Sequence, residues 1–143
     1  MALPGKHSNE GAEHTSTGSV MRPAQQEQLD FEIEFFNAIL ERRPEYVDVL
    51  RVMGNNLTIK GLYAQGLQID KRLVQLRPGD PLAHYNLACS YALLQRLEQC
   101  LKTLRRAIEL GYRDFRYMRE DRDLDSVRND PRFRQLLREF ENH

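Results

Sequence analysis

The chain has 143 residues, of which 41% are hydrophobic and 29% charged, and its 21 basic residues balance 21 acidic ones. This composition is typical of a globular chain that is long enough to bury one core, and it excludes a fully disordered protein. The zero formal charge argues against a general nucleic-acid binder or a protein that binds anionic membranes, since both need a basic surplus.

The N-terminal segment 1–24 is polar and rich in Gly, Ser and Thr. It contains too little apolar surface to bury, so residues 1–24 are predicted to form a disordered tail. The tail lacks the apolar core of a secretory signal. No stretch of the chain approaches the ~20 apolar residues of a membrane span.

Residues 25–43 are predicted to form a single leading helix. Its apolar stripe is Leu29, Ile33, Phe36 and Leu40, which recur at steps of three and four. No helix pair is predicted before it to cover its outer side. We therefore expect it either to cap the fold or to use its exposed aromatic residues in a contact.

Residues 44–80 and 81–113 are each predicted to form a pair of helices. In the first pair, Gly61 ends the first helix, and Gly54 lets the two helices approach closely. Asp80 is expected to cap the next helix, with Pro81 at its first position. The second pair is predicted to run from Pro81 to Leu94 and from Leu97 to Leu110.

The sequence matches itself at a period of about 34 residues. The equivalent positions include Ile33, Leu67 and Leu101; Met53-Gly54 and Leu87-Ala88; Leu57 and Tyr91; and Pro44 and Pro78. This period and pattern resemble the tetratricopeptide repeat, or TPR. The resemblance implies an all-α, right-handed solenoid of antiparallel helix pairs with about seven helices. It implies protein binding as the function, without naming the partner.

Two acidic residues depart from this pattern. Asp70 occupies a position where the repeat has a large apolar residue, so we expect a gap or an exposed site there. Asp121 replaces a leucine of the repeat, and Arg122 a small residue. Residues 114–143 are therefore predicted to be a degenerate third repeat with a short helix around 114–120.

A closing helix is predicted to begin with Asp130 as its cap and Pro131 at its first position. Its apolar stripe contains Phe133, Leu136, Leu137 and Phe140. The run from Asp123-Leu124 through Val127 to Leu136-Leu137 is similar to the closing element of many bacterial TPR proteins, and we expect it to cover the last repeat.

No catalytic or metal-binding pattern emerges, so the sequence predicts neither an enzyme nor a cofactor. Asp121-x-Asp123-x-Asp125 begins like a calcium loop, but Arg132 stands where the bidentate glutamate belongs. We interpret these acids as loop and cap residues. Cys89 and Cys100 form no Cys-x-x-Cys motif and are expected to pack in helices, as in a cytoplasmic protein.

The resemblance places the binding surface in a concave groove lined by the first helix of each pair. The predicted partner is another protein or peptide, with no role for nucleic acid or membrane. The candidate groove residues are Asp48, Arg51, Asn55, Thr58, Ile59, Leu82, Tyr85, Asn86, Cys89, Arg116 and Arg119.

Two alternatives remain open at this point. In the first, Arg51, Asn55, Asn86 and Arg116 match four of the five positions of the clamp with which TPR co-chaperones hold a terminal carboxylate. The fifth position is Glu120, which has the wrong sign. In the second, Leu29, Phe31 and Phe35 of the leading helix make a weak homo-oligomer.

Overall fold

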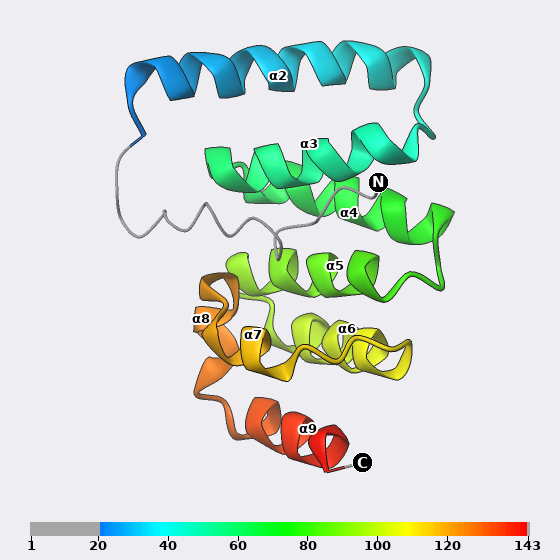
Figure 1. Cartoon of the computed structure of the whole chain (residues 1–143), viewed down its shortest axis with the longest axis vertical. Coiled ribbons are helices and arrows are strands. Elements are labelled where there is room, and N and C mark those ends of the chain that lie inside the picture. Colours follow the sequence, from blue (N-terminus) through cyan, green and yellow to red (C-terminus); the bar gives the residue numbers. More distant parts are fainter. Residues whose placement is uncertain (1–20, 143) are drawn as a thin grey trace.

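The computed structural model describes residues 21–142, which form eight α-helices, one short 3-10 helix and no strand (Figure 1). The predicted all-α class is confirmed, with one helix more than the approximate number expected. The predicted disordered tail lies outside the described residues, apart from its last four positions. Two of these, Pro23 and Ala24, are helical, so the leading helix begins two residues earlier than predicted. The elements are α2 (Pro23–Arg42), α3 (Val47–Lys60), α4 (Tyr63–Leu76), α5 (Pro81–Leu93), α6 (Leu97–Glu109), α7 (Phe115–Glu120), η2 (Arg122–Leu124), α8 (Asp125–Arg128) and α9 (Pro131–Glu141).

The helix starts follow the period of the sequence. Helices α3, α5 and α7 begin at Val47, Pro81 and Phe115, which are equally spaced along the chain. Helices α4, α6 and α9 begin at Tyr63, Leu97 and Pro131, with the same spacing. The third helix pair thus keeps the period although its sequence departs from the repeat pattern at Asp121, and only its first helix is broken into α7, η2 and α8.

Helices α2 to α6 stack in chain order, α9 lies at the opposite end from α2, and α7 and α8 lie at the side of the stack, level with α5 and α6 (Figure 1). Each helix from α2 to α5 packs against the next one, α9 packs against α6, and η2 and α8 pack against α5. Two buried apolar clusters lie along this stack. The first cluster contains residues of α2, α3, α4 and the start of α5. The second contains residues of α5, α6, α7, η2, α8 and α9.

The predicted helix boundaries are confirmed where a cap defines them. Gly61 ends α3 in the left-handed conformation, with φ of 88°. Asp80 accepts hydrogen bonds from the backbone N–H groups of Leu82 and Ala83, and Pro81 is the first residue of α5. Asp130 and Pro131 play the same roles in α9.

Asp70 neither leaves a gap nor lies at the surface, so this prediction is wrong. Its side chain is 3% exposed and accepts a hydrogen bond of 2.5 Å from the Ser90 hydroxyl of α5. Gly54 makes room for it, because a Cβ atom at position 54 would lie 2.8 Å from the Asp70 Oδ1. The close approach predicted at Gly54 is therefore confirmed, and a buried polar joint links α4 to α5.

Candidate functional site

The α3 side of the predicted groove is accessible. Asp48 and Ile59 are exposed, and Asn55 is half-buried. Ile59, which is 41% exposed, is one of the few exposed large apolar side chains in the described residues. Residues at these positions of α3 can touch a partner without any rearrangement of the fold.

Arg51 is engaged within the molecule. Its guanidinium donates a hydrogen bond of 2.6 Å to the Asp80 carboxylate, which also caps α5. Burial acts to raise the pKa of Asp80, but the hydrogen bond and positive charge of Arg51, with two backbone N–H donors, hold that pKa below its usual range. Arg51 therefore ties α3 to the start of α5.

The α5 side of the predicted groove is closed. Tyr85, Asn86 and Cys89 are all buried. The segment from Tyr112 to Leu124 packs over Tyr85 and Cys89. The Tyr85 ring stacks on Tyr112, with centroids 4.3 Å apart and planes 3° apart. The prediction that these three residues line an open surface is not what the structure shows.

A buried polar cluster holds this cover in place. The Tyr85 hydroxyl donates a 2.6 Å hydrogen bond to Asp121, and the Cys89 thiol lies 3.7 Å from the same carboxylate oxygen. Burial, with the neighbouring thiol and carboxylate, raises the pKa of Tyr85 well above its usual value. The other Asp121 oxygen accepts from the Asp123 backbone N–H and so caps η2, as the sequence predicted.

The cluster also contains three groups of a kind that bind metal ions. The thiol sulfur of Cys89 and one carboxylate oxygen each of Asp121 and Asp123 all lie within 4.8 Å of one another. The hydrogen bonds that Asp121 accepts account for this arrangement. The other cysteine, Cys100, is buried among apolar residues, and burial raises the pKa of its thiol to about 12.

The clamp residues do not share one surface. Arg51 is paired with Asp80 and Asn86 is buried, whereas the Arg116 side chain is 90% exposed and lies 3.8 Å from Glu120. Arg119 points away from the groove and pairs with Glu141 of α9.

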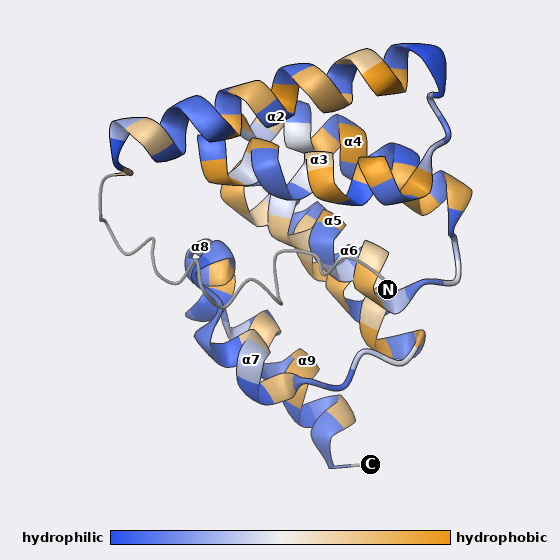
Figure 2. Ribbon diagram, turned by 45° about the horizontal axis from the view of Figure 1, so that its top comes forward, coloured by the Kyte–Doolittle hydropathy of each residue, from blue (hydrophilic) through white to orange (hydrophobic). Residues whose placement is uncertain are grey.

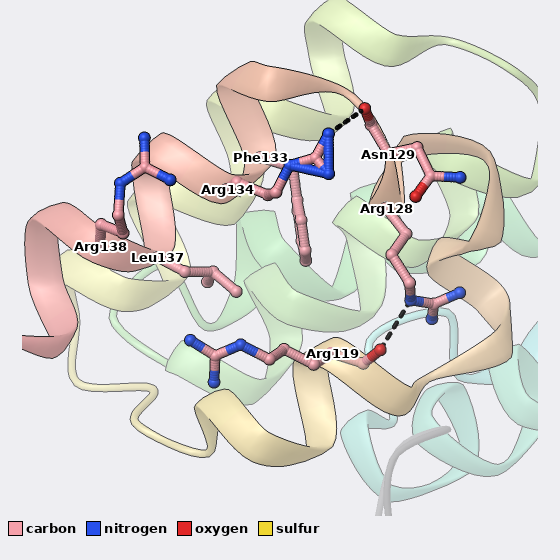
Figure 3. A pocket seen from close by; sticks show the side chains of 7 residues that line it. All are labelled: Arg119, Arg128, Asn129, Phe133, Arg134, Leu137 and Arg138. Atoms are coloured by element: carbon pink, nitrogen blue, oxygen red, sulfur yellow. Dashed lines mark hydrogen bonds between the residues drawn. The ribbon is translucent and has the colours of Figure 1, made fainter.

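Arg119 instead lines an open pocket of about 460 Å³ between α7, α8 and α9, shown in Figure 3. Sequence reasoning missed this pocket, because its lining comes from three elements that meet only in the fold. The available signal was the pair Arg134 and Arg138, which lie four residues apart on the polar face of the closing helix. The pocket is lined by Arg119, Arg128, Asn129, Phe133, Arg134, Leu137 and Arg138.

The leading helix carries exposed aromatic side chains. Phe31 is 61% and Phe35 52% exposed, and their rings stack with centroids 6.0 Å apart. Leu29 is buried, so its predicted role as an exposed contact is wrong. Figure 2 shows apolar positions recurring along α2, which lies at the edge of the stack.

None of the helices in residues 21–142 is both long and apolar enough to cross a membrane.

No protein-family model matches the chain. Among curated proteins it is similar to a chloroplastic protein of Arabidopsis thaliana, with 31% identity over 91 residues. The matched segment covers 62% of this chain and 27% of that relative, so the chain spans about a quarter of the relative's length.

Proposed function

We propose that the chain is a non-catalytic protein-interaction module of the TPR type. The observation that carries this proposal is the equal spacing of successive helix starts, in a stack where neighbouring helices pack in chain order. The spacing equals the period of the tetratricopeptide repeat, whose stacked helix pairs present an extended surface to other proteins.

The proposed contact surface is the exposed face of α3. Asp48, Asn55 and Ile59 supply a charge, an amide and an apolar side chain there, a combination that suits an extended peptide or a helix of another protein. We do not propose the terminal-carboxylate clamp, because Arg51 forms an ion pair with Asp80 and Asn86 is buried.

Site-specific photo-crosslinking tests this surface. A photoreactive amino acid replaces Ile59 or, as a matched control on a distant exposed helix face, Gln99 of α6. Position 59 is expected to capture a discrete protein in the source cells, and position 99 is not. Asp48→Lys in the same chain should reduce the adduct; equal adducts from both positions would contradict the proposal.

Self-association through α2 is a second candidate, favoured by the exposed Phe31–Phe35 stack. Exposed stacked aromatics on the outer side of the first described helix are unusual for a monomer, since the outer face of a helix stack is normally polar. Light scattering across a concentration series tests it, and a constant monomeric mass would refute it.

For location we propose the cytoplasm. The name of the Arabidopsis relative places that protein in the chloroplast, which makes a plastid the alternative. Fractionation of source cells with an antibody against this chain distinguishes the two.

A further inference from the structure

The pocket beside α9 contains positive charge that the molecule does not neutralise. Of its four arginines, Arg119 pairs with Glu141 and Arg128 with Asp125. Arg134 donates to the Asn129 backbone carbonyl oxygen at 2.9 Å. Within the described part of the chain, neither Arg134 nor Arg138 forms an ion pair, although the charge of Arg134 acts on the Asp130 carboxylate and helps to lower its pKa. Like charges four residues apart on a helix repel each other, so an external anion would stabilise them.

The pocket also has apolar walls. Phe133 and Leu137 lie between the arginines in Figure 3, and because they are only 1% and 2% exposed they offer a small apolar surface at the base of the pocket. An occupant that fits both features has carboxylates beside an apolar or aromatic side chain. An aromatic ring gains further from guanidinium groups above it, as Arg105 over Phe140 already shows in this chain.

The outer face of α2 has this composition. Glu27, Glu34 and Glu41 follow one another at steps of seven residues and therefore lie on one side of the helix. They form no ion pair with any residue in 21–142. Phe31 and Phe35 lie beside them, half or more exposed.

The other two acids of α2 are different, because they are already engaged within the molecule. Asp30 pairs with Lys60 at 2.6 Å, and Glu32 accepts from Asn56 at 3.2 Å. The unpaired acids of α2 are thus confined to the side that carries the exposed phenylalanines.

The two surfaces lie at opposite ends of the stack (Figure 1), so one molecule cannot bring its own together. We propose that the acidic face of α2 in one copy docks in the arginine pocket of a second copy. The contact is head-to-tail, which leaves one α2 and one pocket open at the ends of each assembly and allows further copies to add.

Charge favours this arrangement over two α2 helices packing on each other. A symmetric contact between two α2 helices would place the row Glu27, Glu34 and Glu41 against its own copy, and like charges across an interface oppose association. The inference rests on the self-association candidate of the proposed function, and it adds the surface that receives α2.

Two variants separate the two halves of the contact. The pocket variant is Arg134→Gln with Arg138→Gln, and the α2 variant is Glu27→Gln and Glu34→Gln with Phe31→Ser. All five side chains are exposed, so circular dichroism should report unchanged helix content. Arg96→Gln, another exposed arginine, is the matched control.

Analytical ultracentrifugation is expected to show concentration-dependent assembly of the wild type. Each variant alone should associate at least about tenfold more weakly, while the control should behave like the wild type. An equimolar mixture of the two variants should form a 1:1 dimer and nothing larger, because only one intact α2 and one intact pocket remain. Added salt should weaken the dimer.

Three results would overturn the proposal. A monomeric wild type at high concentration and low salt would refute both this contact and the self-association candidate, and would leave the pocket to an acidic segment of another protein. Assembly that the pocket variant retains would refute the pocket alone and indicate contact between two α2 helices. A mixture of the variants that stays monomeric would refute their complementarity.

Discussion

Two buried carboxylates, Asp70 and Asp121, use the same chemistry at two different joints. Each accepts a hydrogen bond from a hydroxyl on α5: Asp70 from Ser90 at 2.5 Å, and Asp121 from Tyr85 at 2.6 Å. Asp70 joins two neighbouring regular helices, whereas Asp121 fastens the irregular segment before η2 over the face of α5. The comparison shows that α5 is the helix through which both halves of the stack are held.

The surroundings of the two carboxylates differ. Ser90 is a small side chain, and Gly54 supplies the space beside Asp70. Tyr85 brings a large ring that stacks on Tyr112 and lies near Tyr117, with centroids 6.4 Å apart in the second case. The Asp121 joint thus combines a hydrogen bond with aromatic packing, and the Asp70 joint depends on the hydrogen bond and a close helix approach.

The largest expected effect is that of Tyr85→Ala. Loss of a fully buried aromatic side chain should lower the free energy of unfolding by about 4 kcal/mol, because it leaves a cavity under the cover formed by Tyr112 and the η2 segment. Urea unfolding followed by far-ultraviolet circular dichroism measures this. A loss no greater than that of Tyr85→Phe would mean that the ring contributes little.

Tyr85→Phe removes the hydroxyl alone and keeps the stacked ring. We expect a loss of about 2 kcal/mol, since Asp121 would lose a short hydrogen bond in a buried setting. The same unfolding measurement applies, with Tyr91→Phe on the half-buried side of α5 as the matched control. Equal stability of Tyr85→Phe and the wild type would argue against the Asp121 joint.

Ser90→Ala tests the other joint and should have a smaller effect, about 1 kcal/mol. The lost hydrogen bond to Asp70 costs stability, but alanine has a helix propensity better than serine by about 0.5 kcal/mol, which offsets part of the cost. Thermal and urea unfolding of the single variants and of Ser90→Ala with Tyr85→Phe would show whether the two joints act independently.

The smallest effect is expected from Asp80→Asn, and it should depend on pH. The folded pKa of Asp80 lies below 3.8, so its charge stabilises the fold above that pH, and this contribution is lost as the pH falls through the folded pKa. Asparagine still caps a helix. The stability difference between wild type and variant should therefore be present at neutral pH and shrink in acid; a constant difference would contradict the Arg51–Asp80 account.

Local signals in the sequence predicted much of the fold. Asp80-Pro81, Asp130-Pro131 and Gly61 define helix ends through bonds within a few residues, so their outcome did not depend on distant packing. In the degenerate third pair the helix starts were predicted from local signals, and in the structure they also keep the repeat period.

The site was harder to predict because it depends on distant segments. The repeat position of Tyr85 and Cys89 predicts a concave surface, but the chain beyond Gly111 folds back over them. Asp70 and Asp121 were visible as acids in apolar positions, yet nothing local identified Ser90 and Tyr85 as their donors. The arginine pocket likewise forms only when α7, α8 and α9 meet.

The contact of Gly54 with Asp70 has a consequence for how this sequence can change over time. A side chain at position 54 would collide with the Asp70 carboxylate, which in turn accepts a hydrogen bond from the Ser90 hydroxyl. The three positions, on α3, α4 and α5, therefore form one unit of sequence variation. A lineage that acquires alanine at 54 is expected to replace Asp70 by a shorter or apolar residue, and then to lose the need for a hydroxyl at 90.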